Sequence, residues 1–508
     1  MHTDQRQPDL AFRGIGTIQP NSSRWLSLLV LCAGFLMIVV DATIVNVALP
    51  SIQHDLAFSQ SNLAWVVNAY LIAYAGIMLL AGRLGDLIGR KRIFLIGIAL
   101  FTTASLLCGL SFSQPLLIAA RFAQGVGGAL SSAVILGMVV TLFPEPGDQV
   151  RAIGIFSFVA SAGAAVGLLA GGLITQAISW HWIFFVNLPI GVTTAVLASR
   201  LLASDPGIGL GEGADVLGAV LVTVALMLGV YAIVESDSYG LGSLRTIGIG
   251  AVATSLLVAF VIRQAVARNP ILPLRLFRSR AVSGANLIQT VMGGAFFGFF
   301  FLGSLDMERV LRFGPLAIGL AFLPVALGMG ALSIGLSARL TLRFGARNVL
   351  LTGQALIVIG LVLIAHGPMH GEYVRDLLPM MALLGVGGGL AFPALTVLAM
   401  SRATPQDAGL ASGLLNTTSQ VGAALGLAVL ATLAANRTDH LLAAKLNTIA
   451  ALSGGYHFAW AIGAGLVVAT ILVAVTLLRS EPARVAATDS SLSPEAADSE
   501  PEVEEICA

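Results

Sequence analysis

The sequence alternates between long apolar runs and short polar segments along most of its length. A helix of about 20 apolar residues spans the hydrocarbon core of a bilayer, whereas surface helices of soluble proteins carry a polar face that these runs lack. The pattern therefore predicts an all-α polytopic membrane protein with about fourteen spanning helices. They are expected at residues 25–49, 62–82, 93–110, 115–140, 152–175, 182–202, 214–234, 244–264, 283–305, 315–337, 349–366, 377–400, 408–433 and 457–478.

The composition supports this class and excludes others. Hydrophobic residues make up 57% of the 508 residues and charged residues 10%, whereas soluble domains carry about 25% charged residues. A net charge of +1 without a basic stripe argues against a nucleic-acid partner. The sequence shows no metal-ligand cluster, nucleophile–base set or phosphate-binding loop. We therefore expect neither an enzyme nor a metal or cofactor, and no obligatory protein partner is evident.

Charge in the loops predicts the orientation. With the N-terminus in the cytoplasm, most of the 27 Lys and Arg residues fall on the cytoplasmic side, including "GRKR" at 89–92 and "RLFRSR" at 275–280. By the positive-inside rule, both termini are expected to be cytoplasmic. We expect a cytoplasmic (inner) membrane, in a bacterium because Arg far outnumbers Lys.

Two pairs of segments repeat between the halves of the chain. "GRLGDLIGRKRIFLIG" from Gly82 matches "ARLTLRFGARNVLLTG" from Ala338 at several positions, and "GVGGAL" at 125–130 matches "GVGGGL" at 385–390. This predicts two six-helix bundles related by duplication, at 25–202 and 266–478. Two linker helices are expected within 203–265. A cytoplasmic tail is expected at 1–24, and an acidic, disordered one at 479–508.

Asp41 is a lone carboxylate in the apolar stretch "MIVVDATIVNVALP". A charged Asp near the centre of a spanning helix costs about 2.5–3.5 kcal/mol on insertion. Counted at 1.5 Å per residue, Asp41 and Arg121 of the fourth helix lie at similar depths. One interpretation is a static buried ion pair. Because such pairs stabilise poorly and intramembrane charges commonly line a pathway, the other is a proton-coupling site that Arg121 tunes.

The segment "GRLGDLIGRKR" (82–92) joins the second and third helices. Its glycines permit tight helix ends, and Asp86 and Arg90 are spaced to pair. One interpretation is that the basic residues only hold the loop in the cytoplasm, but it does not explain Asp86 or the spaced glycines. The candidate inner gate comprises Gly82, Asp86, Gly89, Arg90 and Arg92.

Two further patterns each permit two interpretations. Gly163, Gly167 and Gly171 recur every fourth residue and form one groove along a helix, for ordinary packing or for gating. Asp306 and Glu308 lie at the outer end of the ninth helix, either as an exposed salt-bridged terminus or as a second protonatable or cation-attracting site. Polar residues expected to face a cavity or neighbouring helices are Asn46, Asn68, Asn286, Gln289, Asn416 and Gln420.

These motifs together resemble the major facilitator superfamily, specifically its fourteen-helix drug:proton antiporter branch. "DATIVNVALP" resembles the branch's first-helix signature, "GRLGDLIGRKR" the superfamily loop motif and "RFAQGVGG" the fourth-helix proton-transfer motif. The fifth-helix antiporter motif is matched by Gly154, Gly163, Gly167, Gly171 and Gly172. Leu168 replaces the usual proline of that motif, and "LDME" around Asp306 replaces the usual "LYLQ".

The resemblance implies alternating access between two bundles, with proton entry driving export of small amphipathic or cationic drugs. Protons would be the coupling ion, and the partners would be a small-molecule substrate and the lipid bilayer. Two alternatives stay open: an exporter of a single self-made metabolite or antibiotic, and a non-transporting membrane sensor or scaffold that acts through its acidic tail.

Overall fold

The computed structural model describes residues 21–205, 207, 209, 213–240, 242–368, 372–400 and 408–478, all helical apart from short connections. Twelve described helices are long and apolar enough to cross a membrane, and the apolar helices Ala162–Ala177 and Pro315–Ala331 are shorter. The N-terminal half contains α1 (Asn21–Leu56), α2 (Gln60–Leu63), α3 (Trp65–Ile88), α4 (Arg90–Gly109), α5 (Gln114–Leu142), α6 (Pro146–Ala177), α7 (Trp182–Phe185) and α8 (Asn187–Leu201).

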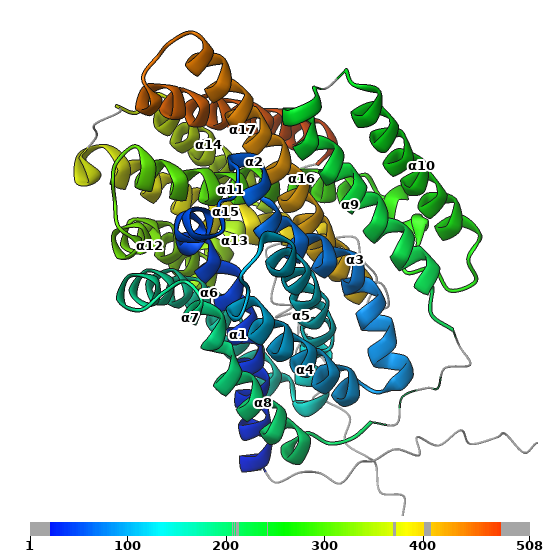
Figure 1. The fold of residues 1–508 in the computed structure, drawn as a ribbon. Helices are drawn as coiled ribbons and strands as arrows, with labels where there is room; N and C mark the ends of the chain where they lie inside the picture. Colours follow the sequence, from blue (N-terminus) through cyan, green and yellow to red (C-terminus); the bar gives the residue numbers. More distant parts are fainter. Residues whose placement is uncertain are drawn as a thin grey trace, which may run out of the picture.

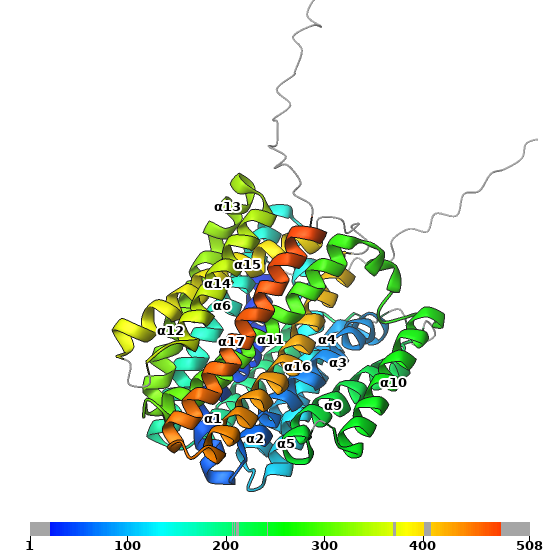
Figure 2. The same ribbon diagram turned by 90° about the horizontal axis from the view of Figure 1, so that it is seen from above.

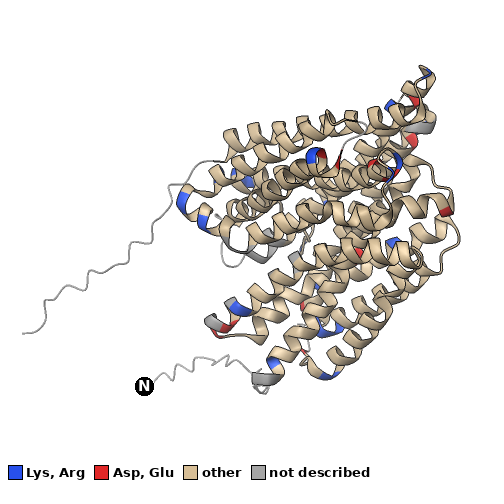
Figure 3. Ribbon diagram, turned by 90° about the vertical axis from the view of Figure 1, so that its left-hand side faces the viewer, with Lys and Arg blue, Asp and Glu red and all other residues tan. Residues whose placement is uncertain are grey.

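Two helices and a second half follow. α9 (Val216–Tyr239) and α10 (Leu244–Val266) form an antiparallel pair at one side of the molecule (Figures 1 and 2). The second half contains η2 (Leu274–Arg278), α11 (Arg280–Arg309), α12 (Pro315–Ala331), η3 (Leu332–Leu336), α13 (Ser337–Phe344), α14 (Ala346–Ala365), η4 (Tyr373–Leu377), α15 (Leu378–Met400), α16 (Ala408–Ala443) and α17 (Thr448–Leu477). Figure 3 shows that charged residues gather near helix ends, which is the distribution a multi-pass membrane protein requires.

Each predicted span coincides with a described helix or a consecutive helical pair, but several boundaries were wrong. The first helix continues through Pro50 to Leu56, and α16 continues to Ala443 rather than ending at 433. α17 begins at Thr448, before the predicted 457. These extensions contain polar residues, so hydropathy placed them in loops, although backbone hydrogen bonding continues the helix beyond the apolar segment.

The two halves repeat their local structure. Gly89 (φ +108°) separates α3 from α4, and Gly345 (φ +82°) separates α13 from α14, at matching places of the repeated motif. Two residues later, the Lys91 Nζ donates to the Leu202 carbonyl after α8, at 2.6 Å. The equivalent Arg347 Nη2 donates to the Val475 carbonyl in α17, at 2.7 Å.

Glycine contacts in the helix cores repeat as well. A Cβ built on Gly97 would lie 2.8 Å from the Gly127 carbonyl oxygen, and one built on Gly353 would lie 2.7 Å from the Gly387 oxygen. Only glycine permits such close backbone approach at these two crossings. Similar crossings from similar sequence support the predicted duplication.

The α9–α10 pair lies beside both halves, because α9 packs against α3 and against α16. Asp215, the buried N-cap of α9, accepts hydrogen bonds from Arg263 Nε at 3.0 Å and Gln264 Nε2 at 2.6 Å, both in α10. Burial alone would raise the pKa of Asp215, but the bonds from Arg263, Gln264 and the Gly218 amide lower it below its ordinary value. This network ties the two helices together at one end.

The two bundles touch at the end predicted to be extracellular. The Arg309 guanidinium at the end of α11 donates to the Gln53 side chain near the end of α1. The Leu316 amide of α12 donates to Gln176 Oε1 of α6, at 3.2 Å, and a Cβ on Gly172 would lie 2.8 Å from Leu316 Cα. These contacts close α1 and α6 against α11 and α12.

Candidate functional site

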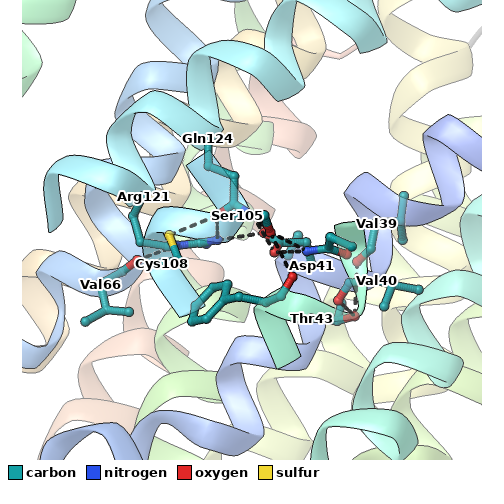
Figure 4. Close-up of polar contacts among 12 residues, drawn as sticks. Val39, Val40, Asp41, Thr43, Val66, Ser105, Cys108, Arg121 and Gln124 are labelled. Carbon is teal, nitrogen blue, oxygen red and sulfur yellow. Dashed lines mark hydrogen bonds and ion pairs between the residues drawn. The ribbon is translucent and has the colours of Figure 1, made fainter. Parts of the chain in front are cut away.

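Asp41 and Arg121 form an ion pair inside the N-terminal bundle. Asp41 lies in α1 and Arg121 in α5, and their exposed fractions are 0% and 1%. The Arg121 Nη1 donates to Asp41 Oδ2 at 2.6 Å (Figure 4). The structure therefore brings together the two charged residues that the sequence predicted to lie at similar depths in the membrane.

Two amide side chains complete the environment of the Asp41 carboxylate. Gln124 Nε2 donates to Oδ1 at 2.7 Å, and Asn187 Nδ2 donates to the same oxygen at 2.9 Å. Both amides also donate to Ser105 Oγ, at 3.0 and 2.8 Å. The carboxylate is thus held by α5 and α8, while Ser105 links the two amides from α4.

Arg121 is held by more than its ion pair. Its Nε donates to the Val66 carbonyl of α3 at 3.0 Å, and its Nη1 donates to Gln124 Oε1 at 2.6 Å. The guanidinium carbon lies 4.4 Å from the centre of the Tyr70 ring, within cation–π range. If the charge on Asp41 changed, Arg121 would keep contacts with α3 and α5.

The sequence interpretation missed Ser105, Gln124 and Asn187. A signal existed for Gln124, which follows Arg121 by three residues and therefore lies on the same face of α5. Asn187 is a polar residue at the start of an apolar helix, which is weaker evidence. Nothing in the sequence around Ser105 distinguishes it from other small residues of membrane helices.

The predicted inner-gate residues surround the α3–α4 junction. Arg90 Nη2 lies 3.1 Å from Asp86 Oδ1, and Arg90 Nη1 donates to the Gly137 carbonyl of α5 at 3.1 Å. Asp205, which follows α8, accepts from the Arg90 amide at 3.0 Å. The junction therefore joins α3, α4, α5 and the segment after α8.

One glycine of the predicted gate does not lie at a tight helix end. Gly82 lies within α3, and a Cβ there would meet nothing within 4 Å. Arg92 is exposed. Gly89 alone of the gate glycines has a positive φ, so the turn depends on that residue.

The glycine groove of α6 faces α1. A Cβ on Gly163 would lie 3.1 Å from Val39 Cγ1, and those on Gly167 and Gly171 would each lie 2.8 Å from α1 carbonyl oxygens. Gly172 instead contacts α12. The packing expected for Gly154 is absent, because its Cβ would meet nothing within 4 Å. Nine residues before Gly163, Gly154 falls on the opposite face of the helix.

Asp306 and Glu308 occupy the last turn of α11, at the helix end where the sequence placed them. The Asp306 Oδ1 atom is buried and has no hydrogen-bond partner among the described residues. The nearby Arg309 donates across to Gln53 of the other bundle. An exposed, salt-bridged helix end therefore does not describe Asp306.

The six polar residues expected at a cavity are distributed over four helices. Asn46 donates to carbonyls of its own helix, and Asn286 Oδ1 accepts from Thr418 at 2.9 Å, joining α11 to α16. Asn68 is buried, and both its amide atoms have no partner among the described residues. Asn416 is exposed, while Gln289 and Gln420 are half-buried.

Among the described residues, no group of three or more His, Cys, Asp or Glu side chains could hold a metal ion. The chemistry available at Asp41 is therefore that of a carboxylate surrounded by one cation and two amides. Such a group can bind a proton or a cation, or keep its partners in place.

Comparisons with known proteins agree with this architecture. The family model described as Major Facilitator Superfamily matches residues 31–427 and 287–499. The puromycin resistance protein pur8 of Streptomyces alboniger is 35% identical over 485 residues, covering 94% of this chain and 96% of that protein. The cephamycin export protein CmcT of Amycolatopsis lactamdurans is 36% identical over 426 residues, covering 84% and 88%.

A solved structure shows the same fold. The bacterial homologue of the human lysosomal transporter Spinster, in an inward-facing conformation, superposes with a TM-score of 0.64 at 15% sequence identity. The superposition covers 91% of this chain and 100% of that chain.

Proposed function

Because the chain belongs to the Major Facilitator Superfamily, a family of transporters rather than enzymes, we propose that it is a proton-coupled antiporter. It exports small amphipathic or cationic compounds across the cytoplasmic membrane by alternating access, with both termini in the cytoplasm. The observation that carries this proposal is the Asp41 carboxylate, fully buried and held by Arg121, Gln124 and Asn187.

The geometry suggests how proton binding moves helices. When Asp41 accepts a proton, its carboxylate loses its negative charge. The side chains of α5 and α8 that donate hydrogen bonds to it then face a neutral group. Charge-assisted hydrogen bonds are roughly twice as strong as neutral ones, so protonation weakens the link between α1 and these two helices. A proton moving down the membrane potential releases about 2.3 kcal/mol per 100 mV. This free energy is available to drive export.

The contacts between bundles support alternation. The Arg309–Gln53 and Leu316–Gln176 bonds join the bundles at the predicted outer end. In this account they break when the protein opens outward, and the α3–α4 junction with Asp86 and Arg90 then closes the inner side.

A second candidate is export of one antibiotic or self-made metabolite by the same mechanism. The observation that favours it is that pur8 and CmcT, which resemble this chain over most of its length, are each named after a single antibiotic. The third alternative, a sensor acting through the acidic tail, concerns residues 479–508, which lie outside the described residues.

Efflux from intact cells tests the proposal. Cells expressing the wild-type chain, Asp41→Asn or the matched surface change Asp439→Asn are loaded with a fluorescent lipophilic cation, with and without a protonophore. We expect efflux from the wild type and Asp439→Asn only, and its loss with the protonophore. Efflux that survives both Asp41→Asn and the protonophore would refute proton coupling through Asp41, whereas resistance to one antibiotic without cation efflux would favour the narrow exporter.

A further inference from the structure

The C-terminal bundle contains a second carboxylate that the mechanism above does not use, Asp306, whose Oδ1 atom is buried. Asp306 lines a cavity of about 20 Å³ enclosed by residues of α11, α14, α15 and α17 and the turns beside them. A volume of this size accommodates about one water molecule. The cavity is therefore too small for an organic cation, and a proton carried by water fits it.

The polar atoms of this cavity suit a protonated carboxyl group better than a metal ion. The Asp306 Oδ1 and the Trp460 Nε1 are buried without hydrogen-bond partners among the described residues, and Trp460 is only 1% exposed. An indole N–H is a donor only, so it offers a bond to an oxygen and repels a cation. Ser453 Oγ and His457 Nε2, 3.4 Å apart, supply the other polar groups.

The internal repeat relates this cavity to the Asp41 site. Arg121 lies four residues before "GVGGAL", and Met381 lies four residues before "GVGGGL". Cys108, which contacts Gln124, lies 19 residues after Gly89, and Ile364 lies 19 residues after Gly345. Both Met381 and Ile364 line the Asp306 cavity. Two residues of the cavity wall thus occupy repeat positions of the Asp41 site, with a methionine in place of the arginine, while Asp306 itself lies nearer its helix end than Asp41 does.

We propose that Asp306 is a second proton-binding site, located at the outer end of the C-terminal bundle. Burial of an ionised carboxylate without a cation partner is costly, and at the position equivalent to Arg121 the chain has an uncharged Met381. A hydronium ion transfers its proton to a carboxylate oxygen and is left as water. The O–H group formed then donates a hydrogen bond to Ser453, His457 or a water molecule. The proposal extends the antiporter mechanism but does not depend on it, because proton binding needs no substrate.

Other titratable groups lie near Asp306. On its own helix and just beyond are Glu308, Arg309 and Arg312, and His54 of α1 faces Glu308. From α17 come Tyr456 and His457, and His366 at the end of α14 lies near His457. α15 and η4 contribute the apolar Leu377, Met380 and Met381 to the wall. The measurement must therefore distinguish a carboxyl group from imidazoles.

Infrared difference spectroscopy makes that distinction, because only a protonated carboxyl group gives the carboxylic C=O band. The full-length chain is purified without substrate in an Asp41→Asn background, and spectra are compared between alkaline and acidic pH. We expect a carboxylic band to persist in this background, to disappear with Asp306→Asn and to be unchanged with the neighbouring Glu308→Gln. An identical band in all three proteins would overturn the proposal.

Two further variants guard against a folding defect. Asp306→Glu retains the carboxyl group, and we expect its band to remain at a shifted frequency. Trp460→Phe keeps an aromatic side chain but removes the indole N–H group, and it should also shift the Asp306 band. If neither variant shifted the band, the carboxyl signal would come from another residue and the assignment would be contradicted. If efflux failed while the Asp306 band titrated as expected, the transport proposal would fall and this one would stand.

Discussion

Arg309 at the end of α11 donates a hydrogen bond to Gln53 at the end of α1 and so joins the two bundles at their predicted outer end. The guanidinium therefore contributes to the contact between the bundles, which breaks in the proposed mechanism when the protein opens outward.

The first prediction concerns this contact. A hydrogen bond to a charged donor contributes about 1.5–3 kcal/mol, so Arg309→Ala should increase the ratio of outward-open to outward-closed protein by roughly ten- to a hundredfold. A cysteine introduced at Leu316, labelled with a membrane-impermeant maleimide, reports the opening as a labelling rate. Arg437→Ala, at an exposed outer position, is the control; equal labelling rates in the two variants would show that the Arg309–Gln53 bond does not hold the bundles closed.

Substitutions in the buried Asp41–Arg121 pair should affect the stability of the protein and its transport activity differently. Asp41→Asn leaves the Arg121 charge buried without its counter-ion, and breaking a buried pair costs about 3–5 kcal/mol. The double variant Asp41→Asn/Arg121→Gln removes both charges and should recover most of that stability in a thermal melt. It should still lack proton-coupled efflux, and recovery of efflux in the double variant would mean that the pair is structural.

Two glycines of α6 should respond in opposite ways to alanine. A Cβ on Gly167 would meet Thr43 Oγ1 and the Val40 carbonyl, so Gly167→Ala should destabilise the protein by about 1–3 kcal/mol through overpacking. Gly154 has open space, and alanine there should stabilise the helix by about 0.5–1 kcal/mol. Melting temperatures of the two variants check this, and a shift of the same sign in both would contradict the assigned faces of α6.

The exact helix ends and the hydrogen-bond partners of Asp41 could not be predicted from the sequence. Long apolar runs predicted the spans, since membrane insertion is decided by local hydropathy. The extensions of α16 and α17 were missed because polar residues can continue a helix outside the membrane. Depth along two helices predicted that Asp41 could reach Arg121, but Ser105 and Asn187 come from α4 and α8, and their convergence depends on tertiary packing.

The fourth prediction is a pH dependence of the α9–α10 pair. The pKa of Asp215 is lowered in the folded protein, so its ionised form stabilises the fold above the unfolded pKa of about 4. That contribution is lost as the pH falls through the lower, folded pKa. Asp215→Asn should therefore reduce stability at neutral pH, and the difference from the wild type should shrink under acidic conditions. A pH-independent difference in the melts would exclude this linkage.

The central claim is that protonation of Asp41 couples substrate movement to the proton gradient. The most direct test uses proteoliposomes containing the wild-type chain or Asp41→Asn, with a compound that wild-type cells export. We expect Asp41→Asn to retain exchange of that compound at equal pH on both sides but to lose accumulation driven by a pH gradient. Gradient-driven accumulation at the wild-type level in Asp41→Asn would contradict the account.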